Sequence, residues 1–497
     1  MGTPANDCNE NNYDFDQGMT ESSLSTELGK DTEEKKPQKD TLLFCDIVCI
    51  VSLISVSFLF SCGYSLLAPF FPKEATKKGV SLTMIGAIFA SFEFANTLFS
   101  PVVGALMSKV TPKYLYLAGC IFGAVTTTLY GLLDMAQDTR TFTTLCFILR
   151  IADALAAATC SCTGMTILTS LYPSRMSTLI GLSESSLGIG FMVGPALGGA
   201  LYQAGGFMVP FFVVGVCILI SAFPPMCLIP KQLKPADQVL EKSPSIWRLL
   251  TRPAILMSCL SLALASLTLN FQNPVLGKHL EQFHLGTALQ GLVFIIAPSS
   301  FTIAAPLIGI VIDKWKCGRT CTVVGTFVIS ALYLILGPCP IFHMQPELWM
   351  SAVPLLTMGL AFASTIIPGF TLILEDAIKV GFPDSMGTKG VVSGIVLFSF
   401  NFGAFVGPMS AGNLVDAVGY AWACSVVSLV AFVVAITISI TYAVLHYQQR
   451  SLSETETPFL GDDKNDKLNE SSHILMRKIP TYSSHSSDKP LSSPSSD

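Results

Sequence analysis

The chain has 497 residues, of which 51% are apolar and only 13% are charged, and its mean hydropathy is +0.58. Soluble domains contain about 25% charged residues, so this composition cannot supply the polar surface that a soluble chain of this length needs. It excludes soluble enzymes, disordered scaffolds and disulfide-rich secreted modules, and it predicts a polytopic membrane protein. The formal net charge of −5 says little, because the charges lie mainly at the two ends and in a few loops.

The two ends of the chain differ from its middle. Residues 1–41 are polar and acidic and contain no apolar stretch of the kind that a cleaved signal peptide needs. Residues 448–497 are rich in Ser, Asp, Lys and Thr. Neither end has enough apolar side chains to form a core, so we expect two disordered tails.

Between the tails, long apolar runs alternate with short polar breaks. A helix needs about 20 predominantly apolar residues to cross a bilayer. The segments that meet this requirement number twelve, at 42–68, 81–103, 114–133, 142–170, 178–203, 208–229, 254–276, 287–312, 321–338, 347–374, 388–413 and 419–447. We therefore predict an all-α membrane protein with twelve transmembrane helices.

The longest polar stretch between these segments, 230–253, divides them into two sets of six. We expect an N-terminal half over 42–229, a linker over 230–253 and a C-terminal half over 254–447. Among the loops between segments and the residues that border them, those that follow even-numbered segments, the linker included, hold thirteen Lys and Arg residues, whereas the opposite loops hold five. Because cytoplasmic loops are enriched in Lys and Arg, both tails and the linker are expected in the cytoplasm.

Two local patterns recur in the same order in the two halves. The second segment ends in SPVVGALMSKV (100–110) and the eighth in APLIGIVIDKW (305–315). The fifth segment contains GFMVGPALGG (190–199) and the eleventh contains GAFVGPMSAG (403–412). Repetition at nearly the same spacing predicts two parallel six-helix repeats, an arrangement in which transporters place their site near the membrane midplane.

The Gly-x-x-x-Asp-Lys pattern at Gly309, Asp313 and Lys314 resembles the cytoplasmic loop signature of the major facilitator superfamily. A glycine lets two helices approach closely, and the carboxylate can cap or pair with a neighbouring helix end. Such a contact can hold one conformation and break in the other. The first half keeps Gly104 but has Ser108 in place of the acid, which argues against a charged contact there.

The fifth segment carries a glycine-proline pattern at Gly190, Gly194, Pro195, Gly198 and Gly199. It resembles the signature that proton-coupled antiporters of this superfamily carry in their fifth helix. Glycines spaced by four residues form a smooth face for close packing, and a proline removes one backbone hydrogen bond and kinks the helix. Ordinary packing of small residues, without a role in transport, is the alternative interpretation.

Four charged residues lie deep inside predicted spans: Glu93, Arg150, Asp153 and Glu184. An ionised side chain at the bilayer centre costs about 2.5–3.5 kcal/mol on insertion scales, so each needs a cavity, a partner or a proton. Arg150 and Asp153 are three residues apart and can pair, either as a structural ion pair or as a proton-linked switch.

Glu93 and Glu184 have no partner within four residues on their own helices, which favours a functional role. A carboxylate in a dry site binds a proton readily, and it releases the proton when it is hydrated and near a cation. Exchanging a cation for protons requires this behaviour.

The interiors of the C-terminal segments carry amides and aromatic rings instead of charges. Asn270, Asn273, Asn401 and Phe398 are the candidates for lining a substrate path, because amides and ring faces suit an organic cation. The alternative is that such phenylalanines simply pack or face lipid.

No enzyme signature or metal site is found in the sequence. Cys317 and Cys321 share a loop, but no second pair or histidine stands nearby to complete a zinc site. The histidines lie outside the predicted helix centres, and no zinc-protease motif or phosphate-binding lysine loop occurs. We expect no enzymatic activity, metal, cofactor or nucleic-acid partner, with protons as the coupling ion.

Several longer stretches resemble the vesicular amine transporter family over residues 42–447. They are YSLLAPFFPKEATKKG (64–79), FEFANTLFS around Glu93, LRIADA around Arg150, GLSESSLGIGFMVGPALGGALYQAGGFMVPF (181–211) and GPCPIFHMQPELW (337–349). The resemblance implies import of spermine, spermidine or related amines into acidic secretory or synaptic vesicles in exchange for lumenal protons. It also implies coupling or substrate roles for Glu93, Arg150, Asp153 and Glu184. The monoamine branch carries further acids in its C-terminal helices, and none lies at depth here.

Two other interpretations stay open. The chain could be a plasma-membrane antiporter of drugs or monoamines, or a membrane receptor or channel that does not perform coupled transport. In the C-terminal tail, ESSHIL (470–475) resembles an acidic dileucine sorting signal, which would bind a clathrin adaptor.

Overall fold

The computed structural model describes residues 44–67, 70–229, 246–284, 287–338 and 347–456. Over these residues the regular structure is helical and contains no strand. Twelve stretches are long and apolar enough to cross a membrane. The predicted all-α, twelve-helix fold is confirmed.

The helices fall into two groups along the chain. In the N-terminal half they are α2 (Phe44–Ser65), α3 (Phe71–Lys77), α4 (Leu82–Leu106), α5 (Pro112–Gly131), α6 (Thr139–Leu171), α7 (Met176–Gly205), α8 (Met208–Ser221) and α9 (Phe223–Leu228). The linker contains α10 (Ile246–Leu250). In the C-terminal half they are α11 (Pro253–Leu280), α12 (Thr287–Trp315), α13 (Gly318–Leu336), α14 (Leu348–Ile366), α15 (Pro368–Lys379), α16 (Met386–Val418) and α17 (Tyr420–Glu456).

Two details differ from the predicted boundaries. The last helix is longer than expected, because α17 continues to Glu456 and includes the first residues of the expected C-terminal tail. The expected linker contains the short helix α10. Within the tenth segment, the sequence predicts that Pro354, Pro368 and Gly369 break the helix. The structure has α14 ending at Ile366 and α15 beginning at Pro368, which has no N–H to donate, whereas Pro354 lies inside α14 and does not break it.

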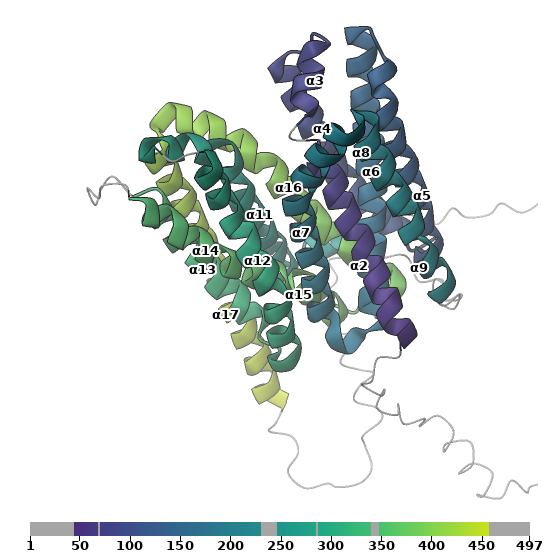
Figure 1. Ribbon diagram of the computed structural model, residues 1–497. Helices are drawn as coiled ribbons and strands as arrows, with labels where there is room; N and C mark the ends of the chain where they lie inside the picture. The colour runs from purple at the N-terminus through teal and green to yellow at the C-terminus, as the bar shows by residue number, and fades with distance from the viewer. Residues whose placement is uncertain (1–43, 68–69, 230–245, 285–286, 339–346, 457–497) are drawn as a thin grey trace, which may run out of the picture.

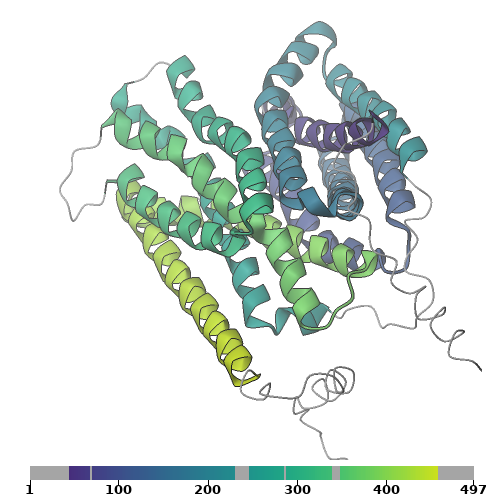
Figure 2. The ribbon, with the colours of Figure 1, turned by 90° about the horizontal axis from the view of Figure 1, so that it is seen from below.

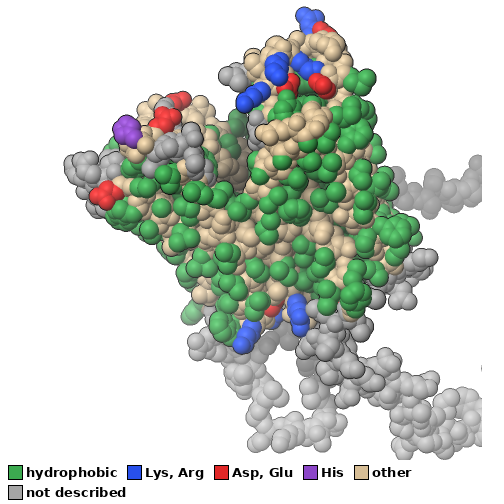
Figure 3. Space-filling model, in the orientation of Figure 1, with side chains coloured by type: hydrophobic (Ala, Val, Ile, Leu, Met, Phe, Trp, Pro, Cys, Tyr) green, Lys and Arg blue, Asp and Glu red, His purple; other side chains and the backbone are tan. Residues whose placement is uncertain are grey.

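The two halves form two bundles that stand side by side (Figures 1 and 2). We call the end at which α2 begins and α17 ends the tail face; it is at the bottom of Figure 1. The opposite end is the distal face. Apolar side chains cover the flank of the molecule and charged side chains gather at its two ends (Figure 3), as expected for a lipid-embedded protein.

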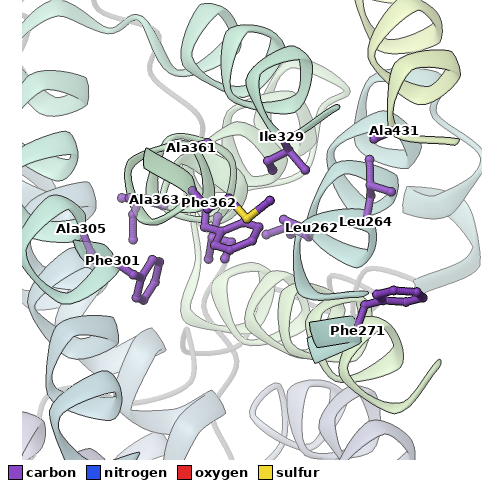
Figure 4. Close-up of a cluster of buried hydrophobic side chains, with 14 of the residues drawn as sticks. Leu262, Leu264, Phe271, Phe301, Ala305, Ile329, Ala361, Phe362, Ala363 and Ala431 are labelled. Carbon is purple, nitrogen blue, oxygen red and sulfur yellow. The ribbon is translucent and has the colours of Figure 1, made fainter. Parts of the chain in front are cut away.

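Each half has its own apolar core. The N-terminal core includes buried side chains of α2, α4, α5, α6 and α8. The C-terminal core draws on α11 to α17, and Figure 4 shows part of it, including Leu262, Phe271 and Phe362. Ile180 of α7 belongs to the C-terminal core as well, so the two halves share buried apolar surface.

The halves are joined first by α4 and α16. A β-carbon at Gly104 would lie 2.7 Å from the carbonyl oxygen of Gly390 and 2.9 Å from the α-carbon of Gly394, so these helices touch backbone to backbone. Farther from the tail face, Asn401 donates a hydrogen bond to the hydroxyl of Ser100 (3.4 Å).

The second junction joins α7 and α12. A β-carbon at Gly181 would collide with the backbone of Ala305, and the hydroxyl of Ser185 donates to the carbonyl of Thr302 (2.6 Å). These contacts lie between the tail ends and about the middle of the helices. At the distal face the surface is hollowed between the two halves (Figure 3). The conformation is therefore closed at the tail face and open at the distal face.

Candidate functional site

Asp313, near the tail-face end of α12, fastens the two halves together. Its carboxylate accepts hydrogen bonds from the backbone N–H of Ser177 (3.0 Å) and from the N–H and hydroxyl of Thr178 (2.8 and 2.7 Å). These residues open α7, where unpaired N–H groups and the helix dipole favour an anion. Gly309, one turn earlier, allows the approach because any side chain there would collide with the backbone of Ser177. We call this contact the Asp313 latch.

Lys314 follows the acid in the second half, and Ser108 stands in place of the acid in the first half. Neither residue takes part in the Asp313 latch. Lys314 is exposed and lies 5.9 Å from the centre of the Trp315 ring. Ser108 hydrogen bonds to the carbonyl of Ala105 on its own helix (2.7 Å). A β-carbon at Gly387 of α16 would lie 3.5 Å from the β-carbon of Ser108, so the first half meets its partner through packing and without a charge.

The glycines of α7 form the close-packed face that their spacing predicts. Gly190 and Gly194 pack against α2, and a β-carbon at Gly194 would lie 3.0 Å from the carbonyl oxygen of Cys62 on that helix. A β-carbon at Gly198 would lie 2.5 Å from the carbonyl oxygen of Leu66, the residue that follows α2. Gly199 is different, because a β-carbon there would meet nothing within 4 Å. Pro195 lies within α7, which runs without interruption.

Arg150, in the middle of α6, is enclosed by aromatic rings. The guanidinium carbon lies 5.3 Å from the ring centre of Tyr64, 5.2 Å from Phe89, 5.6 Å from Phe92 and 5.6 Å from Tyr130. The side chain is 1% exposed. Its Nε and Nη2 atoms are buried without a hydrogen-bond partner. We call these four rings the aromatic box.

Asp153 does not form the ion pair with Arg150 that their spacing allows. Its Oδ1 accepts hydrogen bonds from the hydroxyls of Thr126 and Thr127 on α5 (both 3.4 Å). Arg150 still acts on it electrostatically, but neither residue contributes to a salt bridge in the described part of the chain. The guanidinium lies among the rings of the box and the carboxylate beside the two threonines, so the pair that the spacing allows is not made.

Glu93 lies in the middle of α4 and is half-buried. The polar groups that act on it are the hydroxyl of Tyr64 and the guanidinium of Arg150. The structure therefore brings Glu93, Arg150 and Asp153 together around one box in the N-terminal half.

Glu184 stands apart from this group, at the junction of the two halves. It lines a small pocket with Ile180 and Met165 from its own half, and the C-terminal half supplies the other walls: Leu262, Ile366, Phe370, Val396, Leu397 and Phe400. The volume open to the centre of a water molecule is about 10 Å³, which is room for about one water. Within the described residues Glu184 has no hydrogen-bond or ion-pair partner.

The polar candidates of the C-terminal half are dispersed. Asn401 is buried at the α4–α16 junction, and Asn270 hydrogen bonds to the carbonyl of Ser266 (2.9 Å). Asn273 lines a pocket of about 40 Å³ between α11, α12 and α14. Phe398 is 37% exposed and stacks on Phe402.

Phe398 is two residues from Phe400, a wall of the Glu184 pocket, and residues two apart point to nearly opposite sides of a helix. Phe398 therefore does not line the pocket around Glu184.

Two groups outside the spans shape the distal face. The ammonium of Lys77 and the hydroxyl of Tyr202 donate hydrogen bonds to Glu74 of α3, and they hold the pKa of this carboxyl below its usual value, Lys77 to a larger extent than Tyr202. His279, at the end of α11, stacks on the ring of Tyr420 with centres 3.9 Å apart, and burial lowers its pKa to about 4.

The aromatic box was not found from the sequence. Its rings come from α2, α4 and α5, while the guanidinium comes from α6. No motif marks such a set, because its members are brought together only by packing of helices distant in sequence. Among the described residues, no group of three or more His, Cys, Asp or Glu side chains is arranged to hold a metal ion.

Comparison with known proteins shows that this chain is similar to membrane transporters. The model of the Major Facilitator Superfamily matches residues 53–388. The human protein described as "MFS-type transporter SLC18B1" is 33% identical over 413 residues, which cover 82% of this chain and 89% of that protein. The human chromaffin granule amine transporter is 24% identical over 378 residues, covering 74% of this chain and 66% of that protein.

Solved structures agree with the fold. A bacterial homologue of the iron transporter ferroportin, crystallised in an outward-facing state, has a TM-score of 0.64 at 14% identity, over 79% of this chain and 99% of that one. The human organic anion transporter MFSD10 has a TM-score of 0.61 at 16% identity, over 79% of this chain and 99% of that one. At this level of identity, the likeness concerns the fold alone.

Proposed function

This chain belongs to the Major Facilitator Superfamily and, within it, to the vesicular amine transporter family, and we propose that it is a proton-coupled antiporter that loads polyamines into acidic vesicles by alternating access. Like its relatives, it is a transporter and not an enzyme. In this proposal the tail face is cytoplasmic and the distal face is lumenal.

The observation that carries the proposal is the set of carboxylates that have no salt-bridge partner within the described spans. Glu93 and Asp153 lie near one guanidinium that binds neither, and Glu184 lies alone at the junction of the halves. When all are ionised, three carboxylates against Arg150 leave two negative charges uncompensated. Either protons or an amine with more than one positive charge can neutralise them, and burial makes neutralisation necessary.

The location of Glu184 suggests how occupancy is coupled to conformation. Its pocket has walls from both halves, so opening the tail face would hydrate this carboxylate and favour its ionised form. In the distal-open state it is enclosed by apolar side chains, which favour the protonated form. The amine leaves as lumenal protons enter, and after reorientation the protons are released to the cytoplasm.

The test is amine uptake into proteoliposomes with an imposed pH gradient. Labelled spermine, spermidine and a monoamine are compared for the unchanged chain and for Glu93→Gln and Glu184→Gln. We expect uptake of polyamines against a concentration gradient, and its loss to the level of empty liposomes in both variants. Glu375→Gln is the matched control, because Glu375 is exposed near the tail-face end of α15.

Normal gradient-driven uptake by both variants would refute the coupling roles. A preference for the monoamine would favour the second candidate, a monoamine or drug antiporter. Uptake that never exceeds equilibrium would favour a channel or a receptor.

Delivery to vesicles is a separate part of the proposal. The segment 470–475, which resembles a signal for a clathrin adaptor, lies outside the described residues. Replacing Ile474 and Leu475 by alanine should move a tagged protein from vesicles to the cell surface, as seen by imaging. An unchanged distribution would remove the adaptor contact from the proposal.

A further inference from the structure

The aromatic box has the construction of a site for an organic cation. Its rings come from three helices, Tyr64 from α2, Phe89 and Phe92 from α4, and Tyr130 from α5. Phe92 and Tyr130 are buried, and the rings of Tyr64 and Phe92 are in contact, with centres 4.9 Å apart. Several aromatic rings around one cation are the arrangement by which proteins recognise quaternary ammonium groups.

The occupant of the box is a side chain of the protein itself. Arg150 lies within 6 Å of all four ring centres, the range over which ring faces attract a cation. A buried guanidinium normally has hydrogen-bond acceptors for its N–H groups. Here two nitrogen atoms have none, and the buried hydroxyl of Tyr130 also has no partner. The rings, and not hydrogen bonds, therefore hold the charge in place.

We propose that the aromatic box is a binding site for organic ammonium groups, which Arg150 fills and closes in the distal-open conformation. An ammonium group of a ligand can enter the box only when Arg150 is absent or has moved to Glu93 or Asp153, the two carboxylates on which it acts. The expected ligand is a small ammonium ion that does not need hydrogen bonds, because the box would bind it through the faces of its rings.

This inference deepens the proposed function and rests on it in one respect: it assigns Arg150 a part in substrate selection. With Arg150 in the box, a substrate cation finds only the carboxylates, which suit protonated amines that donate hydrogen bonds. Quaternary ammonium ions donate none and are excluded. Arg150 is then a specificity-determining residue that acts by occupying a site.

The experiment is direct binding, without transport. Purified full-length protein in detergent is titrated with tetramethylammonium in a calorimeter. The unchanged chain should show no saturable binding. Arg150→Ala should gain saturable binding, with an affinity about tenfold or more above the weakest binding that the calorimeter detects. Arg150→Ala combined with Phe89→Leu should lose most of the gain, because one wall of the box is removed.

Arg319→Ala is the matched control. Arg319 also lies over a ring, 5.5 Å from the centre of Tyr442, but it is paired with Asp376 and has one ring in place of four. Its removal should create no tetramethylammonium site. Equal gains in the two alanine variants would overturn the proposal, since binding would then reflect any lost buried charge.

Folding is followed by size-exclusion chromatography and thermal unfolding. If Arg150→Ala is unstable, Arg150→Ser is titrated in the same way. If neither variant folds alone, tetramethylammonium added during purification should restore folded protein, and failure to do so overturns the proposal. A folded variant that binds no ammonium also overturns it. Polyamine uptake by the unchanged chain is measured in parallel. A negative result for the ammonium site can then be distinguished from a negative result for the proposed antiport.

Discussion

In the N-terminal half the middle of the bundle carries Glu93, Arg150 and Asp153, whereas the described helices of the C-terminal half have amides such as Asn270 and Gln272 at their interior. At the tail face the difference is reversed. The C-terminal half supplies the acid of the latch, Asp313, while the equivalent position of the N-terminal half is a serine.

This contrast separates two tasks that a repeated architecture could have duplicated. The charges in the middle of the spans, to which we assign the response to protons and cations, are concentrated in the N-terminal half. The charged contact that holds the closed tail face comes from the C-terminal half. Glu184 is where the tasks meet, because its carboxylate belongs to one half and most of its pocket walls to the other.

The largest expected effect is on the uncharged α4–α16 junction. Gly104→Val would place carbon atoms against the backbone of Gly390 and Gly394. Overpacking costs about 1–3 kcal/mol, so we expect the tail face to open in most molecules and uptake to fall severely. Faster hydrogen exchange in the tail-side halves of α4 and α16 is the measurement. Gly86→Val, on the same helix with open space around it, should change neither exchange nor uptake.

The next effect concerns the charged latch. Asp313→Asn removes the charge that accepts three hydrogen bonds at the start of α7. Hydrogen bonds to charged groups contribute about 1.5–3 kcal/mol. The equilibrium between the closed and the open tail face should therefore shift roughly tenfold toward the open state. Spin-label distances across the tail face should show the change.

Ser108→Asp tests the same contrast in reverse. It would give the N-terminal half an acid of its own, and it should shift the population toward the closed tail face. If Ser108→Asp and Asp313→Asn shift the distances in the same direction, the division of tasks between the halves is incorrect.

The smallest effect lies at the distal face of the C-terminal half. Burial against Tyr420 lowers the pKa of His279 to about 4, while an unfolded histidine titrates near 6.5. The folded state therefore favours the neutral ring, and its contribution to stability is present above pH 6.5 and is lost as the pH falls toward 4. His279→Gln should flatten this part of the melting-temperature profile by about 2–4 °C. An unchanged slope would mean that other groups cause it.

Much of the fold followed from the sequence because lipid constrains it strongly. Length and apolarity define each span, and the repeated glycine patterns mark helix contacts that the structure contains, such as Gly309 against Ser177. Contact of Asp313 with a neighbouring helix end was expected from the Gly-x-x-x-Asp-Lys pattern, because a carboxylate can cap a helix end that a glycine allows to come close. Gly199 shows the limit of such patterns, since it fits the motif and contacts nothing within 4 Å of an added β-carbon.

The site was less predictable, since it depends on which helices face one another. Sequence spacing favoured a pair between Arg150 and Asp153, which share a helix face. The structure places aromatic rings from three other helices around the guanidinium and threonines of α5 beside the carboxylate. The sequence shows which residues share a face of one helix. It does not show which residues of other helices compete for contact with the same side chain.

The short helix α15 links two distant contacts of the protein. It follows α14 with Ile367 in helical backbone angles between them, and it has 12 residues, about 18 Å in length. Near its start lies Phe370, a wall around Glu184, and near its end lies Asp376, which is bound to Arg319 of α13. A single short helix therefore spans the distance between the packing around a buried acid and an ionic contact at the tail-face end of the bundle.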